Sequence, residues 1–293
     1  MSQSDLHALI KLLDDPNEDV FQAVQTALEE KGESIIHTLE DHYMLIDADN
    51  LATQRLAHLI EKIQYSSSYE QLKSWREGGQ NLLEGILILN KYHQRNIPSE
   101  EITYQFSRIR QDIWLELNDR LTPLENIKVL NHILFKLLGF SGVSNELTTA
   151  PHSLHDTLVT KTGTPLSLGT LYLLLAQSLD IPIYGVNLPG HFILCYVEEM
   201  PEWLLPDDAT DNKEILFYVN PYAGGTILDH EEVEQFILNQ HLPLDPHFFE
   251  ACSNRDILIR HLNAFSHHNI ALNQADKVRQ LQVLLSLLLE LED

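Results

Sequence analysis

Cysteine and positive charge are both scarce in this sequence. Only Cys195 and Cys252 occur among the 293 residues, and neither belongs to a Cys-x-x-Cys pair. A disulfide-rich fold is therefore disfavoured, and the composition fits a reducing compartment. The 19 Lys and Arg residues are outnumbered by 43 Asp and Glu residues, which gives a formal net charge of -24. Such a charge repels phosphate backbones and anionic lipids, so we expect neither nucleic acid nor a membrane surface as a partner.

The sequence also lacks the patterns of export and of membrane insertion. Its first residues have no basic flank and no apolar run of the kind found in secretory signals, so we expect a cytoplasmic protein. The most apolar stretch, Pro165 to Leu179, is shorter than the roughly 20 residues that cross a bilayer. Thr164 is a good N-cap, Pro165 suits the first helical position, and Pro182 ends the stretch. A short helix that is apolar nearly all round is predicted to be buried at the centre of the fold.

Three β-rich runs follow this helix, at Ile183–Pro189, His191–Val197 and Ile215–Asn220. Pro189 and Gly190 break the first two runs apart. The acidic insert 198–214 separates the second run from the third and is interpreted as a solvated loop. The order predicts an α+β fold in which the buried helix packs on an antiparallel sheet.

The remainder of the chain is predicted to be helical. Residues 4–43 read as a short helical pair similar to a single HEAT unit, and two C-terminal helices, 254–272 and 275–291, read as a tetratricopeptide-like hairpin. The further predicted helices are 48–63, 69–74, 79–92, 99–118, 122–138 and 229–239, with breaks at Ser66–Ser68 and Gly78–Gly79. We expect a helical N-terminal region (1–120), a central core (121–245) and a C-terminal helical hairpin (246–293).

A helix followed by antiparallel strands is the order in which papain-like cysteine enzymes place their nucleophile, base and orienting residue. His191 opens one predicted strand and Asn220 closes the next. Several motifs make the likeness specific: Leu137-Leu-Gly-Phe140, Ser153-Leu154, Gly163-Thr-Pro-Leu-Ser-Leu168, Leu171-Tyr172, Leu175-Ala176, Gly185-Val-Asn-Leu-Pro-Gly-His-Phe192 and Asn220-Pro-Tyr-Ala-Gly-Gly225. In these motifs, and in its helical flanks, the chain resembles the SirB-type bacterial branch of the transglutaminase-like superfamily.

The resemblance implies a Cys-His-Asp triad whose cysteine lies two residues after a glycine at the helix start. On this sequence Gly163 matches that glycine, Pro165 occupies the cysteine position, His191 the histidine and Asn220 the aspartate. The nucleophile is therefore missing. We expect His191 to be hydrogen-bonded to Asn220 in a vestigial pocket.

Other residues could replace the missing thiol only with difficulty. Ser167 lies two residues on, about 200° round the helix from Pro165, and more often such a hydroxyl bonds the helix cap. Cys195 is four residues along the strand from His191, which separates their Cα atoms by about 13 Å.

The remaining conspicuous residues have structural or weak functional interpretations. Gly190, Gly224 and Gly225 are interpreted as turn residues, and Tyr222 could line a pocket. The 15 histidines form no His-x3-His or His-Glu-x-x-His motif, and no glycine-rich phosphate loop occurs, so we expect neither metal nor cofactor.

These observations favour a catalytically inactive, transglutaminase-like protein that binds a peptide or protein partner. A regulatory role would fit such a protein. One alternative is a hydrolase or acyl-transfer enzyme in which His191 and Asn220 activate Ser167 or water. Another is a structural scaffold whose helical flanks bind partners. The sequence leaves the oligomeric state open.

Overall fold

The computed structural model describes residues 3–45, 51–93, 99–143, 153–199 and 213–289. The chain divides into two compact units, Met1–Gly79 with Lys91–Asn96, and Gln80–Asn90 with Ile97–Asp293. Helices predominate, and the main sheet is antiparallel, so the predicted α+β class is confirmed. Within the described ranges, none of the helices has the length and apolarity that crossing a bilayer requires.

The first unit is helical. Asn17 starts its second helix by accepting a hydrogen bond from the Asp19 backbone N–H, and Gly32, with a φ of +59°, follows that helix. Leucine and isoleucine side chains, Leu28 and Leu39 among them, form its core. Its elements are α1 (Gln3–Lys11), η1 (Leu12–Asp14), α2 (Glu18–Glu29), η2 (Gly32–Ile35), α3 (Ile36–Leu45) and α4 (Leu51–Glu77).

The long helix α4 corrects one prediction. The sequence suggested two helices, 48–63 and 69–74, with a break at Ser66–Ser68, but the helix continues through the serines. Serine has only a modestly lower helix propensity than alanine, and its backbone N–H remains available for the helical hydrogen bond. Ser68 is itself buried, and the apolar face continues beyond it to Leu72 and Trp75. Tertiary packing therefore outweighs the local preference.

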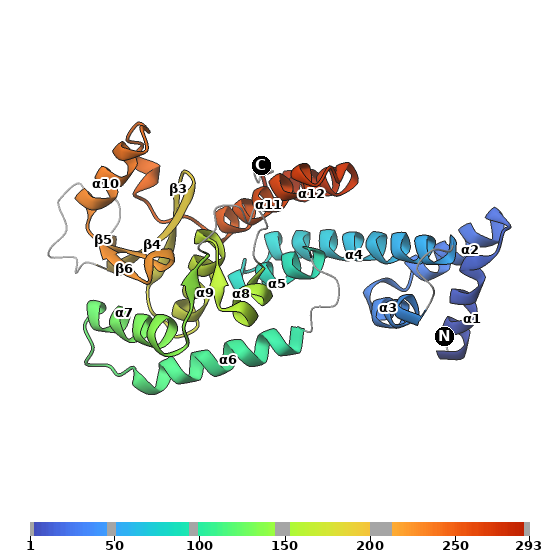
Figure 1. Cartoon of the computed structure of the whole chain (residues 1–293), viewed down its shortest axis with the longest axis horizontal. Coiled ribbons are helices and arrows are strands. Elements are labelled where there is room, and N and C mark those ends of the chain that lie inside the picture. The colour runs from blue at the N-terminus through green and yellow to red at the C-terminus, as the bar shows by residue number, and fades with distance from the viewer. Residues whose placement is uncertain (1–2, 46–50, 94–98, 144–152, 200–212, 290–293) are drawn as a thin grey trace. The chain divides into compact units, whose positions relative to one another are not determined.

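The second unit contains the predicted core helix and the other helices that surround it (Figure 1). The helix predicted over 122–138 changes at His132 into a π-helix, and Gly139, with a φ of +76°, follows it. Its helical elements are α5 (Leu82–His93, whose residues from Lys91 belong to the first unit), α6 (Ser99–Glu116), α7 (Pro123–Asn131), η3 (His132–Leu137, the π-helix), α8 (Leu154–Thr160), α9 (Pro165–Gln177), η5 (Pro221–Ala223), α10 (His230–Asn239), η6 (Pro246–Phe248), α11 (Asn254–Ala271) and α12 (Ala275–Leu289).

The sheet has the order β3-β4-β5-β6, with every neighbouring pair antiparallel. The three predicted strands are confirmed, and a fourth, β6, was not anticipated. Part of the acidic insert is strand rather than loop, because β4 extends to Glu199 and β5 begins at Lys213; residues 200–212 lie outside the described residues. The strands are β3 (Ile183–Leu188), β4 (His191–Glu199), β5 (Lys213–Asn220) and β6 (Thr226–Leu228), and a separate parallel pair consists of β1 (Ser141–Gly142) and β2 (Thr162–Gly163).

The two faces of the sheet are covered by different helices. Phe192 of β4 packs on α9, where a Cβ at Gly169 would lie 2.5 Å from the Phe192 ring. The next residue along β4, Ile193, packs in a cluster with Val233 and Ile237 of α10. Because successive side chains of a strand point to opposite faces, α9 covers one face and α10 the other.

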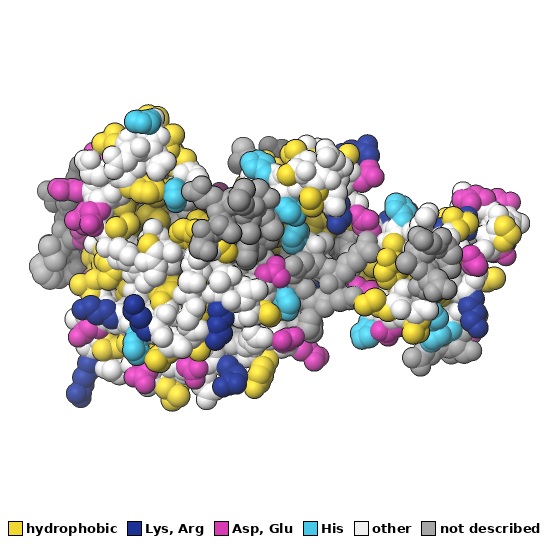
Figure 2. All heavy atoms as spheres, viewed as in Figure 1, with side chains coloured by type: hydrophobic (Ala, Val, Ile, Leu, Met, Phe, Trp, Pro, Cys, Tyr) yellow, Lys and Arg dark blue, Asp and Glu magenta, His cyan; other side chains and the backbone are white. Residues whose placement is uncertain are grey.

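Charge is distributed unevenly over the second unit. Figure 2 shows several Lys and Arg side chains over α6 and α7, and Asp and Glu side chains over α10. Arg108, Arg120 and Lys128 are exposed in the first region, and Glu231 and Glu232 in the second. The excess of negative charge is thus not uniform on the surface.

Candidate functional site

The start of α9 is where a nucleophile would lie, and its polar side chains bond each other. The Thr164 backbone N–H donates to the Ser167 Oγ over 2.9 Å, and the Ser167 backbone N–H donates to the Thr164 Oγ1 over 3.2 Å. Ser167 is only 2% exposed, and a Cβ at Gly163 would lie 2.6 Å from its Oγ. Pro165 occupies the first helical position and has no polar side-chain atom. The Ser167 hydroxyl is therefore part of a helix cap.

The motif Asn220–Gly225 forms a turn that is anchored to the neighbouring elements. The Tyr222 hydroxyl donates to the Val143 carbonyl over 2.8 Å, and a Cβ at Gly142 would lie 2.6 Å from the Tyr222 ring. The Asn220 Oδ1 accepts a hydrogen bond from the Ala223 backbone N–H at 3.3 Å. Tyr222 thus anchors the turn to the β1 region, while Asn220 shapes the turn itself.

Asn131 joins this turn to two helices and was not singled out by the sequence. Its Nδ2 donates to the Gly225 carbonyl over 2.7 Å, and its Oδ1 accepts from the Tyr172 hydroxyl of α9 over 3.0 Å. Gly225 has a φ of +77°, and a Cβ there would overlap the Asn131 amide. Gly224 has a φ of +68° with open space around it. Gly225 is therefore required both by its conformation and by the close approach of Asn131.

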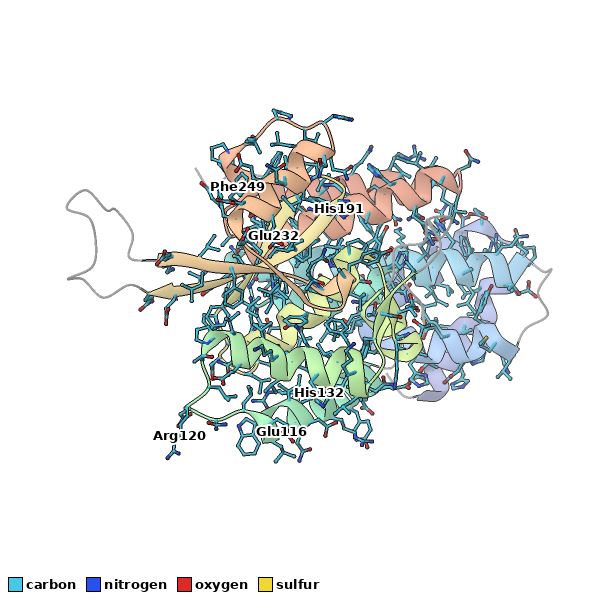
Figure 3. All side chains as sticks on the ribbon, turned by 60° about the vertical axis from the view of Figure 1, so that its left-hand side comes forward. Glu116, Arg120, His132, His191, Glu232 and Phe249 are labelled. Carbon is cyan, nitrogen blue, oxygen red and sulfur yellow. The ribbon has the colours of Figure 1, made fainter. Side chains whose placement is uncertain are left out.

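His191 is half-buried and turned toward α10. Its ring packs edge-to-face on Phe236, with the ring centroids 4.7 Å apart. Burial, with a contribution from the positive charge of Arg260, lowers the pKa of His191 below its ordinary value. Figure 3 shows His191 on the side of the unit that carries α10 and its Glu232.

The structure does not bring the predicted site residues together. His191 precedes Phe192, which packs on α9, so the His191 side chain lies on the face opposite to Pro165 and Ser167. Among the described residues, no hydrogen bond joins the His191 ring to Asn220 or to Ser167, so the expected bond between His191 and Asn220 is wrong. The reason is geometric: the Asn220 oxygen is engaged by Ala223, and the histidine ring is held by Phe236.

The two cysteines are also unsuited to catalysis. Cys195 lies in the cluster under α10, and burial raises the pKa of its thiol to about 12. Burial likewise raises the pKa of the Cys252 thiol to about 12. Since the thiolate is the reactive form, burial disfavours both residues as nucleophiles near neutral pH.

Two residues of α11 form hydrogen bonds to the β3–β4 hairpin and to α9, and the sequence analysis identified neither. Arg260 donates to the Asn187 Oδ1 over 3.1 Å, to the Leu188 carbonyl over 2.9 Å and to the His191 carbonyl. The buried His261 shares a hydrogen bond of 2.9 Å between its Nε2 and the Thr170 Oγ1 of α9. No local motif marks such residues, because their partners lie about 70 to 90 positions away in the chain.

In the part of the chain that the structure describes, no three or more His, Cys, Asp or Glu side chains form a cluster that could hold a metal ion.

Comparison with known proteins agrees with the core fold. Residues 100–263 match the family model of the transglutaminase-like superfamily. Human F-box only protein 21 is 28% identical over 149 residues, which are 50% of this chain and 22% of that protein. The UPF0162 protein of Xylella fastidiosa is 32% identical over 116 residues, or 39% of this chain and 36% of that one. The UPF0162 protein of Vibrio cholerae is 24% identical over 185 residues, or 62% and 63% of the two chains.

These matches cover only part of each relative, from about a fifth of F-box only protein 21 to less than two thirds of the Vibrio protein. No solved structure matches the chain. The family model, however, spans more than half of the sequence and includes α9, the four strands and the Asn220–Gly225 turn. The chain belongs to the transglutaminase-like superfamily.

Proposed function

We propose that this protein is a catalytically inactive member of the superfamily, of the SirB-type branch, that binds a peptide or protein partner in the cytoplasm. The observation that carries the proposal is Pro165 at the first position of α9, where the resemblance implies a cysteine. The Pro-Gly-His-Phe and Asn-Pro-Tyr-Ala-Gly-Gly motifs and the bacterial UPF0162 relatives support the branch.

Acyl transfer of the kind that a Cys-His-Asp triad performs needs a nucleophile with a base within hydrogen-bond reach. Ser167 donates and accepts within the α9 cap, and His191 lies on the other face of the sheet. Removing the nucleophile from a catalytic group that acts as a unit typically costs several orders of magnitude in rate. The geometry therefore favours binding over the alternative in which Ser167 or water is activated.

Turnover assays with the full-length protein test catalytic inactivity. We expect no incorporation of a fluorescent primary amine into a glutamine-containing peptide and no hydrolysis of p-nitrophenyl acetate above the buffer rate. Turnover that disappears in both Ser167→Ala and His191→Ala variants would overturn the proposal, since it would require the two residues to act together.

A cysteine introduced at position 165 tests catalytic inactivity more directly. In Pro165→Cys the new thiol lies at a helix N-terminus, which lowers the pKa of a cysteine. We expect iodoacetamide to alkylate this thiol faster than Cys195 and Cys252, whose pKa values are raised by burial. We also expect no amine incorporation, because no base faces the thiol. Amine incorporation by this variant that is lost in Pro165→Cys with His191→Ala would contradict the position of His191.

A further inference from the structure

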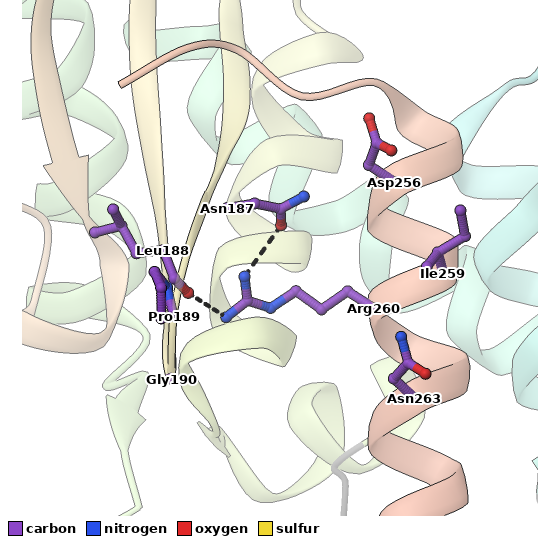
Figure 4. A pocket seen from close by; sticks show the side chains of 8 residues that line it. All are labelled: Asn187, Leu188, Pro189, Gly190, Asp256, Ile259, Arg260 and Asn263. Atoms are coloured by element: carbon purple, nitrogen blue, oxygen red, sulfur yellow. Dashed lines mark hydrogen bonds between the residues drawn. The ribbon is translucent and has the colours of Figure 1, made fainter. Parts of the chain in front are cut away.

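A groove of about 340 Å³ lies between the β3–β4 hairpin and α11 (Figure 4). One wall is the end of β3 with the hairpin turn that follows it, residues 187–190. The other is formed by Asp256, Ile259, Arg260 and Asn263. These four positions have the spacing i, i+3, i+4 and i+7, so they share one face of the helix. The groove has the size of small ligand sites in proteins.

Arg260 donates hydrogen bonds to the hairpin wall and orients Asn187. A guanidinium group can only donate, so the Asn187 oxygen faces Arg260 and the amide nitrogen faces the other way. Figure 4 shows this nitrogen directed into the space between the hairpin and α11. The two N–H groups of Asn187 have no acceptor among the residues that the structure describes. They are available to a ligand.

Asn263 provides a second unused amide on the opposite wall. It is exposed, and its side chain makes no hydrogen bond within the described part of the chain. An asparagine amide both donates and accepts, which is the pair of functions that a peptide group presents. Asn187 and Asn263 together can therefore bond successive peptide groups of an extended chain.

The charge and length of the groove narrow the class of ligand. One carboxylate, Asp256, and one guanidinium, Arg260, balance each other, and the Nη hydrogen bonds of Arg260 go to the hairpin. This balance disfavours a phosphate or another strongly charged ligand. The helix rises 1.5 Å per residue, so Asp256 to Asn263 spans about 10 Å, the length of about three extended residues. Ile259 offers an apolar contact beside them.

We propose that this groove binds an extended, uncharged peptide segment of about three residues. Its main chain bonds the amides of Asn187 and Asn263, and an apolar side chain packs on Ile259. This inference rests on the proposed function, since it gives the place and the chemistry of peptide binding. It assigns no role in binding to the side chains of His191, Asn220 or Ser167.

The test uses the full-length protein and a library of acetylated, amidated pentapeptides, with affinity measured by fluorescence polarisation. We expect the selected peptides to carry an apolar residue and no charge. Asn263→Ala should weaken binding about three- to tenfold, the usual effect of losing a hydrogen bond between uncharged groups. Ile259→Arg should weaken it further by placing a long cation in the groove. The matched control is Asn239→Ala at the exposed end of α10, which should bind as the unaltered protein does.

Nuclear magnetic resonance locates the ligand independently of the variants. The side-chain amide signals of Asn187 and Asn263 should shift on peptide addition, while that of Asn239 should not. Peptides that bind equally well to Asn263→Ala and Ile259→Arg, with shifts elsewhere, would overturn this site and leave the proposed function standing. If no library member binds at millimolar concentration, the groove is not a peptide site. Catalytic turnover in the assays above would instead refute the proposed function.

Discussion

At the scale of single residues, Pro165 and Ser167 both stabilise the start of α9. Proline at the first helical position loses no hydrogen bond, and Ser167 completes a reciprocal cap with Thr164. Both choices stabilise α9 locally. Under the proposed function, the same two residues leave the position that the resemblance assigns to cysteine without a thiol, and they hold the nearby hydroxyl in the cap.

Gly225 gives a prediction at this scale. In Gly225→Ala the new Cβ overlaps the Asn131 amide, and the residue must keep a φ of +77°. The positive φ alone costs about 1–2 kcal/mol, and the overlap adds a further ~1–3 kcal/mol. We expect a loss of about 2–5 kcal/mol in the free energy of unfolding, measured by urea denaturation.

The neighbouring Gly224 is the matched control. It has a φ of +68° but open space around it, so Gly224→Ala should cost only the backbone term of about 1–2 kcal/mol. Equal losses at the two positions would contradict the tight contact between Gly225 and Asn131.

At the scale of elements, α9 and α11 are joined by a buried polar pair. Thr170 and His261 share a hydrogen bond at 2.9 Å, and burial lowers the pKa of His261 to about 3, with a smaller contribution from Arg260. The histidine is therefore neutral in the folded protein near neutral pH. An unfolded chain would protonate it near its ordinary pKa of 6.5.

This difference predicts sensitivity to acid. Below pH 6.5 the unfolded chain binds a proton that the folded protein does not, so stability falls as the pH is lowered toward about 3. The slope from this one group approaches about 1.4 kcal/mol per pH unit. We expect His261→Gln, which keeps a polar group for Thr170, to lose stability less steeply between pH 6.5 and pH 4.

The control for this prediction is His267→Gln, at an exposed position of the same helix. Unfolding by urea at several pH values should give the original steep dependence for the control. If His261→Gln had the same slope as the control, His261 would not be the group responsible.

At the scale of the whole molecule, the dominant quantity is the net charge of -24. Charge of one sign produces repulsion between copies of the chain at neutral pH. Exposed Arg120 and Lys128 near α7 soften this repulsion only locally. The balance changes as the carboxylates and histidines bind protons.

We therefore expect solubility at low salt to fall as the pH approaches the sequence pI of about 4.8. Light scattering of the full-length protein from pH 7.5 to pH 4.5 measures the association, and near-ultraviolet circular dichroism at each pH identifies any loss of tertiary structure. Scattering that stays constant down to pH 4.8 while the fold is retained would show that net charge does not control association.

The sequence by itself determined the elements whose signals are local. Thr164 and Pro165 fix the start of α9, Ser153 fixes the start of α8, and the Pro189-Gly190 break separates β3 from β4. Helix caps, prolines and strand alternation depend only on residues a few positions apart, so they can be recognised from the sequence alone. The motifs around His191 and Asn220 likewise indicated the superfamily.

Only the tertiary structure decided which side chains meet. His191 faces α10 rather than the start of α9, Asn131 bonds Gly225, and Arg260 bonds the β3–β4 hairpin. Each contact joins residues far apart in the chain, and in a strand the direction of a side chain reverses with every residue. The continuation of α4 through Ser68 has the same origin, since packing outweighs a weak local preference. Residue identity could suggest a vestigial triad, but the faces on which those residues lie depend on how the helices cover the sheet.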